Sequence, residues 1–292
     1  MTNKSVTVVG LGPMGQAMAR AFLAGGYGVT VFNRTASRAD ALVNEGAARA
    51  DSIDEALAAN ELVVLSLTDY DAVYEVLGAA TPERLEGRVL ANLSSDTPAR
   101  AREAAEWASE RGAVHLTGGV QVPPSAIGSP ESSTFYSGPE AAFEAHRETL
   151  GVLTGTDYRG EDPGLASLFY QLQMDMFWPS MFSYLHALAI ASEEGIAAET
   201  FLPYATSTMS LLVSLLGLYA PRVDAGEHGG DFENLQMAAA SIEHVIHTGE
   251  AAGVDVSVPA ALRDLVRRGM AAGAGEGSFT GLIEIVKQKA HA

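Results

Sequence analysis

The sequence contains no cysteine and almost no lysine. Without cysteine, disulfides, thiolate metal sites and cysteine nucleophiles are excluded, and the chain is compatible with a reducing compartment. The three lysines are Lys4, Lys287 and Lys289, so the long interval 5–286 has no lysine side chain. Any mechanism that needs a lysine within that interval is therefore excluded as well.

Positive charge in general is scarce, with 18 Lys and Arg against 36 Asp and Glu and a formal net charge of −18 at pH 7. Such a surface repels phosphate backbones and anionic lipids, so neither nucleic acid nor a membrane is an expected partner. The N-terminus lacks the apolar segment of a signal peptide, and the longest apolar stretches, such as 210–220, look too short to span a bilayer. We expect a folded cytoplasmic protein.

The two halves of the chain differ in hydrophobic pattern. Up to about residue 160, short β-branched runs alternate with helical stretches, which predicts an α/β fold with a doubly wound, mostly parallel Rossmann sheet. Strands are expected at 6–9, 29–32, 62–65, 89–91, 114–116 and 134–136, and helices at 14–24, 98–111 and 139–150. After Gly164 only helices are expected, at 165–191, 198–219, 232–252, 258–272 and 279–289.

A segment rich in glycine and acidic residues, 160–164, separates these halves. We therefore predict an NADP(H)-binding Rossmann domain over 1–162 and an all-helical substrate and dimerisation domain over 163–292. The long apolar helix 165–191 needs more burial than one small helical domain supplies. A second copy of the chain would supply it, so the pattern predicts a homodimer.

The motif G-x-G-x-x-G lies between the first strand and the first helix, as Gly10, Leu11, Gly12, Pro13, Met14 and Gly15. In this context the first glycine permits a tight turn, the second lets a pyrophosphate approach the backbone, and the third lets helix and strand pack closely. The helix N-terminus then faces the phosphates. A glycine-rich turn without a ligand is the alternative, and the strand–turn–helix context disfavours it.

The residues after the second strand predict which dinucleotide binds. An NAD site usually has Asp or Glu there for the ribose 2′-hydroxyl, whereas this chain has Asn33. Arg34 can clamp a 2′-phosphate, Thr35 can donate a hydrogen bond, and Arg38 follows one helical turn later. The pattern favours NADP(H), although the same residues could form a solvated turn and helix cap.

Polar loops follow two later strands. Leu67 and Thr68 come after the strand at 62–65, while Asn92 and Ser94 come at the end of the strand at 89–91. Ligands of open parallel sheets lie beyond the carboxyl ends of the strands. We therefore expect these residues to border the ribose and the nicotinamide.

With these motifs the chain resembles the β-hydroxyacid dehydrogenase superfamily, which includes 6-phosphogluconate dehydrogenase-like proteins, and within it the imine reductases. The resemblance to imine reductases covers nearly the whole chain. It is carried by Asn92–Pro98, by the proline-containing segment Leu116–Gly128 with Tyr136-Ser137-Gly138 after it, and by Leu168-Phe169-Tyr170, Met176-Phe177-Trp178 and Leu185–Ala189 on the long helix.

The resemblance also implies a reaction. Hydroxyacid dehydrogenases use a lysine early in the long helix as acid and base for the carbinol, and imine reductases carry Asp or Tyr there. The match falls on Tyr170. This implies an NADPH-dependent imine reductase in which hydride goes to the C=N carbon while the phenol, with an ordinary pKa near 10, donates or orients the proton at nitrogen.

Tyrosine-type relatives tend to give the (S)-amine from simple cyclic imines, which is what the resemblance implies here. An imine offers little beyond one nitrogen, so the substrate pocket should be mostly apolar. Its candidate residues are Val120, Pro124, Trp178, Met181, Phe182, Leu211, Leu215 and Met237. Each could equally be part of a core or of a dimer interface. In a dimer, the site would combine the sheet domain of one subunit with helices of the other.

Other interpretations remain open. A hydroxyacid or small-aldehyde reductase could use Tyr170 as its acid, and the missing lysine disfavours it. An NADP(H)-binding sensor would need no placed phenol, and Tyr170 would then be a core aromatic. His244 and His247 lie three residues apart on a predicted helix, but no third ligand follows in a recognisable pattern, so we predict no metal site.

Overall fold

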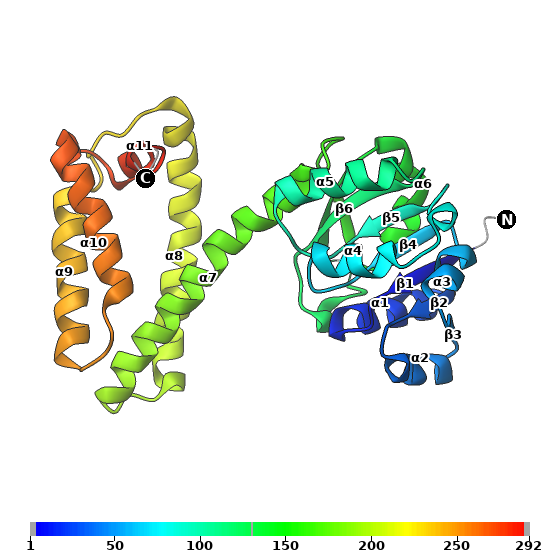
Figure 1. The fold of residues 1–292 in the computed structure, drawn as a ribbon. Coiled ribbons are helices and arrows are strands. Elements are labelled where there is room, and N and C mark those ends of the chain that lie inside the picture. The colour runs from blue at the N-terminus through cyan, green and yellow to red at the C-terminus, as the bar shows by residue number, and fades with distance from the viewer. Residues whose placement is uncertain (1–3, 130, 289–292) are drawn as a thin grey trace. The chain divides into compact units, whose positions relative to one another are not determined.

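The computed structural model describes residues 4–129 and 131–288, and the chain divides into two compact units, Met1–Met176 and Phe177–Ala292. Every strand of the described chain lies in the first unit, and the second contains only helices and turns (Figure 1). The fold class predicted from the sequence is therefore confirmed.

One eight-stranded sheet forms the centre of the first unit, in the order β3-β2-β1-β4-β5-β6-β7-β8. All neighbouring strands are parallel except β6 and β7, which are antiparallel. The strands are β1 (Ser5–Val9), β2 (Gly28–Phe32), β3 (Ala48–Arg49), β4 (Leu62–Leu65), β5 (Val89–Asn92), β6 (Val114–Val120), β7 (Ser133–Ser137) and β8 (Gly155–Tyr158).

Helices cover both faces of this sheet, and β4 shows why a strand between them is apolar throughout. Leu62 and Val64 join the core on one face, with residues of α1 (Pro13–Ala24), α2 (Asp40–Asn44) and α6 (Glu140–Leu150). Val63 and Leu65 join the opposite core, with α3 (Ile53–Ala59), α4 (Tyr70–Gly78) and α5 (Pro98–Ser109). Successive side chains of a strand point to opposite faces, so a doubly covered strand needs a continuous apolar run.

The strand order reverses at β1, which lies between β2 and β4. In the register, Val9 is level with both Phe32 and Leu65, so the three strands end together. Just beyond them, Gly10 N donates to Phe32 O and Ser66 N donates to Val9 O, each over 2.9 Å. Ligands of doubly wound sheets bind at such a reversal, beyond the carboxyl ends of the strands.

The helix α7 (Gly164–Glu193) begins in the first unit and ends in the second. The second unit further contains α8 (Ala198–Ala225), α9 (Leu235–Ala251), α10 (Ser257–Gly269) and the short α11 (Leu282–Val286). Figure 1 shows α9 and α10 side by side, and a small core of Leu235, Val266, Leu282 and Ile285 joins them to α11.

The structure adds detail to two of the sequence-based expectations. The sheet ends at Tyr158 and α7 begins at Gly164, but the compact units divide within α7, because its first turns pack against the sheet through the buried Ala166 and Ser167. The helix expected at 279–289 is a 3₁₀ turn, Phe279–Gly281, followed by α11. Its last expected residue, Lys289, lies outside the described residues.

The expectation that every apolar stretch is too short to cross a bilayer is wrong for one helix. The helix α8 continues through Pro221 to Ala225, and by length and composition it could cross a membrane. One such helix is weak support for a membrane span, since an apolar helix covered by another protein passes the same test. No residue of α8 is buried in the single chain, so its apolar surface requires some cover.

Candidate active site

A groove of about 360 Å³ lies at the carboxyl ends of β1, β2 and β4. It brings together most of the residues that the sequence predicts to bind the cofactor. Its lining comprises Val9, Gly10, Leu11, Gly12, Pro13, Met14, Phe32, Asn33, Arg34, Thr35, Arg38, Ser66, Leu67, Thr68, Ala72 and Val76. Gly15, Asn92 and Ser94 were also predicted for this role, and they lie outside the lining.

The glycine loop fits a dinucleotide pyrophosphate. Gly10 has a φ of +94°, and a Cβ built there would lie 2.2 Å from Ser66 O, so only glycine is accommodated. A Cβ at Gly15 would lie 1.9 Å from Gly10 O, which explains its packing role. Gly12 faces open space and begins α1 without a side-chain cap. The uncapped N–H groups of α1 are thus available to phosphate oxygens.

Asn33 holds the loop beside this site with both ends of its amide. Its Oδ1 accepts from Leu11 N at 3.0 Å, and its Nδ2 donates to Thr35 O at 3.1 Å. An aspartate could keep the first contact but would lose the second, because a carboxylate has no N–H. Asn33 therefore ties the glycine loop to the segment that carries Arg34.

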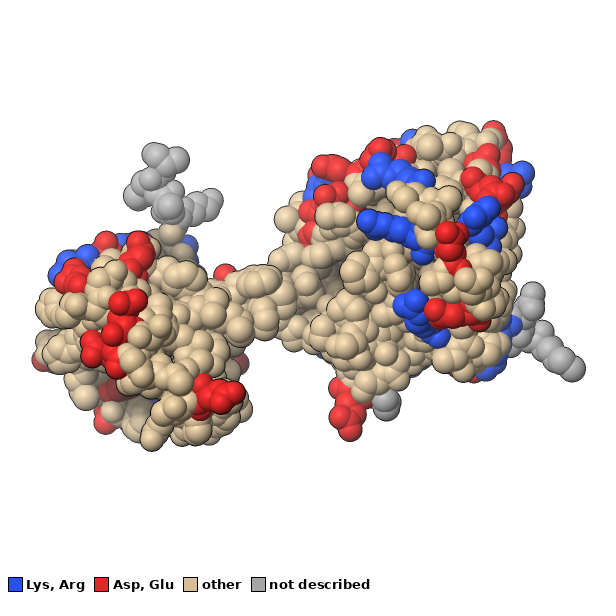
Figure 2. All heavy atoms as spheres, turned by 90° about the horizontal axis from the view of Figure 1, so that it is seen from below, with Lys and Arg blue, Asp and Glu red and all other residues tan. Residues whose placement is uncertain are grey.

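The two predicted phosphate ligands, Arg34 and Arg38, both line the groove, and Arg38 lies on the 3₁₀ turn Ala36–Ala39. The Arg34 guanidinium pairs with Glu75 of α4, with Nη1 and Oε1 2.5 Å apart. On the face shown in Figure 2, basic side chains of the first unit likewise stand beside acidic ones. Arg34 thus combines an exposed guanidinium at the groove with an acidic neighbour that no motif predicted.

A second, smaller cavity of about 40 Å³ contains the predicted catalytic residue, Tyr170 of α7. Of the candidate substrate residues, Val120 lines it, and so does Ser94, which was predicted for the cofactor. Its full lining is Leu93, Ser94, Ser95, Asp96, Gly118, Gly119, Val120, Ser167 and Tyr170.

Ser94 connects this cavity to the cofactor groove. Its Oγ accepts from Leu67 N at 3.0 Å, and Leu67 lines the groove. Asn92, at the end of β5, is fully buried and fixes this turn, because its Oδ1 accepts from Ser94 N at 3.1 Å. Asn92 therefore supports the loop and lines neither of the two cavities.

Close approach of α7 to β6 sets the position of Tyr170. A Cβ at Gly119 would lie 2.9 Å from the Tyr170 Cβ and 3.1 Å from Ala166 O. Ser137 of β7 also holds the helix start, since its Oγ accepts from Ala166 N at 3.0 Å and donates to Pro163 O at 2.9 Å. The sheet thus places the Tyr170 side chain beside the loop that follows β5.

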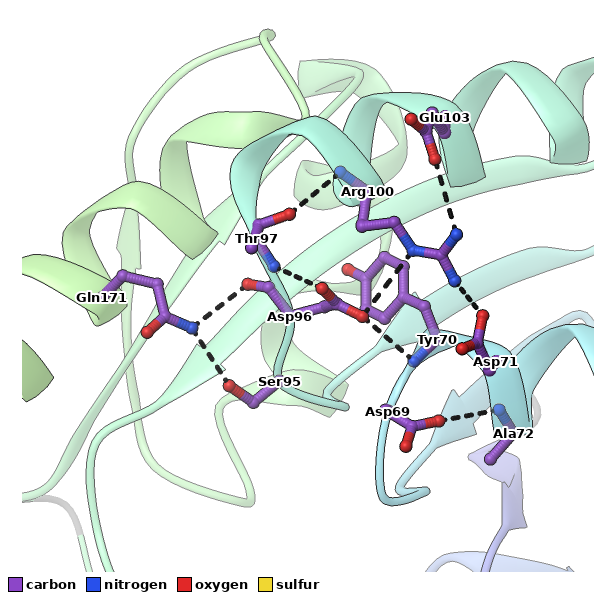
Figure 3. Close-up of polar contacts among 10 residues, drawn as sticks. All are labelled: Asp69, Tyr70, Asp71, Ala72, Ser95, Asp96, Thr97, Arg100, Glu103 and Gln171. Atoms are coloured by element: carbon purple, nitrogen blue, oxygen red, sulfur yellow. Dashed lines mark hydrogen bonds and ion pairs between the residues drawn. The ribbon is translucent and has the colours of Figure 1, made fainter. Parts of the chain in front are cut away.

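A polar cluster joins the loops after β4 and β5 to α7 (Figure 3). The Asp96 carboxylate accepts from Thr97 N at 2.7 Å and from Tyr70 N at 3.4 Å, and pairs with Arg100 at 3.8 Å. Gln171 Nε2 donates to Asp96 O at 3.2 Å and to Ser95 Oγ at 3.4 Å. The sequence did not single out Asp96 or Gln171, because the contacts of Asp96 with Tyr70 and with Gln171 join segments that are far apart in the chain.

Behind this cavity lie two buried rings, Tyr70 and His115, with centroids 6.3 Å apart. Burial raises the pKa of Tyr70 to about 12, opposed by its contacts with Thr117 and Ser167, although neither reaches full hydrogen-bond geometry. Burial alone lowers the pKa of His115 to about 4. Both rings are therefore neutral near pH 7, and they contribute no charge to the site.

The remaining candidate substrate residues lie elsewhere. Pro124 is exposed, on the 3₁₀ turn Pro124–Ala126 near α1, outside both cavities. The others belong to the second unit. Leu215 is partly buried in the single chain, and the rest are exposed: Trp178, Met181, Phe182, Leu211 and Met237. Within residues 4–129 and 131–288, no group of three His, Cys, Asp or Glu side chains could hold a metal ion, and His244 and His247 belong to no such group.

Comparisons with known proteins cover both halves of the chain. The family model of the NAD binding domain of 6-phosphogluconate dehydrogenase matches residues 5–158. The model of the NADPH-dependent reductive aminase-like C-terminal domain matches residues 162–288. The NADPH-dependent reductive aminase of Aspergillus oryzae is 31% identical over 98% of this chain and 98% of its own length.

Solved structures agree. An imine reductase of Bacillus cereus is 61% identical with a TM-score of 0.89, over 98% of this chain and 99% of its own. The Streptomyces aurantiacus imine reductase is 55% identical with a TM-score of 0.94, over 97% and 100%. A reductive aminase of Aspergillus terreus, solved with NADPH and ethyl levulinate, is 35% identical with a TM-score of 0.94, over 98% and 100%.

The predicted cofactor and enzyme class are confirmed by these matches, which extend over the Rossmann and helical parts alike. The chain therefore belongs to the NADPH-dependent imine reductases and reductive aminases, a family of oxidoreductases that act on C=N bonds.

Proposed function

We propose that this enzyme reduces cyclic imines to amines with NADPH and that Tyr170 is its catalytic residue, with a tendency toward the (S)-amine. The single observation that carries the proposal is the position of Tyr170. It lines a cavity whose other wall, Ser94, is hydrogen-bonded to the cofactor groove. A phenol beside the reactive end of the cofactor is where the nitrogen of a C=N bond needs a proton.

In this proposal the groove residues hold the dinucleotide. The N–H groups at the start of α1 bind the pyrophosphate, while Arg34, Thr35 and Arg38 bind the 2′-phosphate. NADPH, when bound, supplies the hydride. The chain fixes the loops that receive it, through Asn33 at one end and Ser94 at the other.

Tyr170 then supplies the proton. A tyrosine phenol carries its proton at neutral pH and can donate it to the imine nitrogen as the C=N bond is reduced. Where the imine is already protonated, the same hydroxyl accepts a hydrogen bond from the iminium and orients it. Tyr70 and His115 are buried and do not line the cavity, which leaves this role to Tyr170.

The absence of lysine separates this reaction from that of the hydroxyacid dehydrogenases. The helix α7 contains no lysine, and neither does any other position between 5 and 286. A carbinol must lose its proton to a base as hydride leaves, and a phenol is a poor base at neutral pH. The polar atoms of the small cavity therefore suit an imine better than a hydroxyacid.

We further propose that the enzyme is a cytoplasmic homodimer with exchanged helical domains. The cavity at Tyr170 is too small for a whole cyclic imine, so further walls are needed. The exposed apolar residues of the second unit, such as Trp178, Leu211 and Met237, are suited to form them from a second copy. The same contact would cover α8 with protein rather than lipid.

Tyr170→Phe tests the proposal. With 2-methylpyrroline as substrate, the variant should consume NADPH about tenfold more slowly or worse, because the proton donor is lost while the ring remains. Its NADPH affinity should stay unchanged. An unaltered rate would remove Tyr170 from the mechanism, and wild-type activity confined to β-hydroxyacids with NADP⁺ would overturn the choice of reaction. Tight NADPH binding with neither activity would favour the sensor.

Reductive amination is a second candidate, favoured by the match of residues 162–288 to the reductive aminase-like model. A ketone and an amine supplied together would have to form their imine on the enzyme. Turnover of cyclohexanone with an excess of a small primary amine, compared with turnover of a preformed cyclic imine, measures this activity. Reduction of only the preformed imine would restrict the function to imine reduction.

A further inference from the structure

The partner of Arg34 bears on cofactor selectivity. Glu75 reaches the Arg34 guanidinium from α4, the helix whose Ala72 and Val76 line the cofactor groove. Both charged side chains are 63% exposed, so the pair is held by water-screened electrostatics and can be displaced. Glu75 thus forms an ion pair with the guanidinium that is the proposed ligand of the 2′-phosphate.

We propose that Glu75 is a specificity-determining residue that competes with the 2′-phosphate for Arg34 and so reduces the preference for NADPH over NADH. The inference rests on the proposed role of Arg34 as a phosphate ligand. A 2′-phosphate carries up to two negative charges, whereas the 2′-hydroxyl of NADH carries none. A carboxylate on the same guanidinium therefore opposes NADPH and is indifferent or mildly favourable to NADH.

Glu75 places a carboxylate near the site of an acidic residue that is absent directly after the second strand. NAD-binding Rossmann sites usually carry Asp or Glu directly after the second strand, where this chain has Asn33. In the folded chain an acid nevertheless reaches the Arg34 segment, from a helix about forty residues further on. The site therefore combines an NADP-type loop with a neighbouring carboxylate.

The contact is specific within α4. This helix has two acidic residues, Asp71 and Glu75, one turn apart. Asp71 pairs with Arg100 of α5, as Figure 3 shows, and Glu75 pairs with Arg34. Only Glu75 of these two acids faces the predicted phosphate site, so only its removal should alter selectivity between the two cofactors.

Glu75→Gln in the full-length enzyme tests this role. Affinities for NADPH and NADH, and for their fragments 2′,5′-ADP and 5′-AMP, are measured by calorimetry at low and high salt. At low salt we expect NADPH and 2′,5′-ADP to bind about three- to tenfold more tightly, with less than about a twofold change for NADH and 5′-AMP. High salt should shrink the gain.

Glu45→Gln is the matched control. Glu45 also pairs with one arginine, Arg20, and the substitution removes the same charge. It should change the binding of both cofactors equally. Weaker NADPH binding in Glu75→Gln, or an equal change for both cofactors, would overturn the proposal. The first result would mean that Glu75 holds Arg34 ready for the phosphate.

A double-mutant cycle with Arg34→Ala separates competition from simple repulsion. If Glu75 acts by occupying Arg34, Glu75→Gln should change NADPH affinity less than about twofold once Arg34 is gone. Full additivity would contradict competition. If Arg34→Ala alone leaves NADPH affinity unchanged, the proposed phosphate site itself is wrong. If Arg34→Ala weakens NADPH but Glu75→Gln has no effect, only the role of Glu75 fails.

Discussion

The sheet unit and the helical unit bury their apolar side chains to very different degrees. In the sheet unit, side chains such as Val8, Phe22 and Leu65 are fully buried by helices on both faces. In the helical unit, Val213 of α8 is 69% exposed and Trp178 of α7 is 65% exposed. The first unit completes its core within one chain, whereas the second leaves a large apolar surface exposed in the single chain, which is the surface that the proposed dimer would cover.

The largest expected effect comes from charging that surface. Val213→Glu should convert the proposed homodimer to monomers and lower imine reduction by about a hundredfold or more, because an unpaired carboxylate would be buried at the interface. Val213→Leu, which keeps the position apolar, is the control. Sedimentation and turnover measure both variants. A Val213→Glu enzyme that stays dimeric would show that this part of α8 lies outside the interface.

A pH experiment probes the core of the sheet unit. His115 has its pKa lowered to about 4 by burial, from an ordinary 6.5. Because the pKa of His115 is lower in the folded protein than in the unfolded chain, its contribution to stability is complete above pH 6.5. That contribution is lost as the pH falls toward 4. Between pH 7.5 and pH 5 the free energy of unfolding should drop by about 2 kcal/mol from this residue.

Replacing His115 with Phe isolates this contribution. Phenylalanine fills a similar volume beside Tyr70 and does not titrate. Urea unfolding at the two pH values should show a smaller pH dependence in His115→Phe than in the wild type, by about the same 2 kcal/mol. Equal pH dependence in the two proteins would mean that His115 can be protonated without unfolding the sheet unit.

Gly119→Ala tests the contact between sheet and α7. The added Cβ would lie 2.9 Å from that of Tyr170, so the helix start must shift and turnover should fall by about tenfold. In the control Gly78→Ala, at the end of α4, the new Cβ meets no atom within 4 Å. Its turnover should match that of the wild type. Wild-type kcat in Gly119→Ala would indicate that Tyr170 needs no fixed position.

The smallest expected effect concerns the loop clamp of Figure 3. Asp96→Asn keeps one acceptor but loses the ion pair with Arg100, so kcat should fall about two- to fivefold with the KM for NADPH nearly constant. Asp71→Asn breaks another of the three ion pairs of Arg100, which also include one with Glu103, and leaves the loop hydrogen bonds intact. It should change kcat less than Asp96→Asn does. An equal loss in both would assign the effect to Arg100 rather than to the loop.

Much of the fold was predictable because its signals are local. The runs at 6–9, 29–32 and 62–65 predicted buried parallel strands, and the structure has them with ends shifted by one residue at most. The two-residue β3 and the polar β8 were missed, since neither carries a β-branched apolar run. The end of the α8 helix was placed too early, because Pro221 looks like a stop but is tolerated there.

The site residues, like the fold, were predictable where their signals are local in the sequence. The glycine loop, Arg34 and Thr68 were found together because each belongs to a loop that follows a strand. Asn92 and Ser94 are predicted cofactor neighbours, and the structure adds that their side chains hold the loops after β4 and β5 together. Contacts such as Glu75 with Arg34 join segments that are far apart in sequence. Neither hydrophobic periodicity nor a short motif predicts contacts of this kind.

By itself, then, the sequence determined the cofactor class, the alternation of strands and helices, and the absence of a catalytic lysine. These properties follow from residue types and from short spacings along the chain. Only the tertiary structure decided that Tyr170 meets Ser94 in one cavity and that Glu75 reaches Arg34. It also showed that the apolar side chains of α8 remain uncovered in the single chain. Side-chain proximity across distant segments depends on packing, and packing is a property of the whole fold rather than of any local pattern.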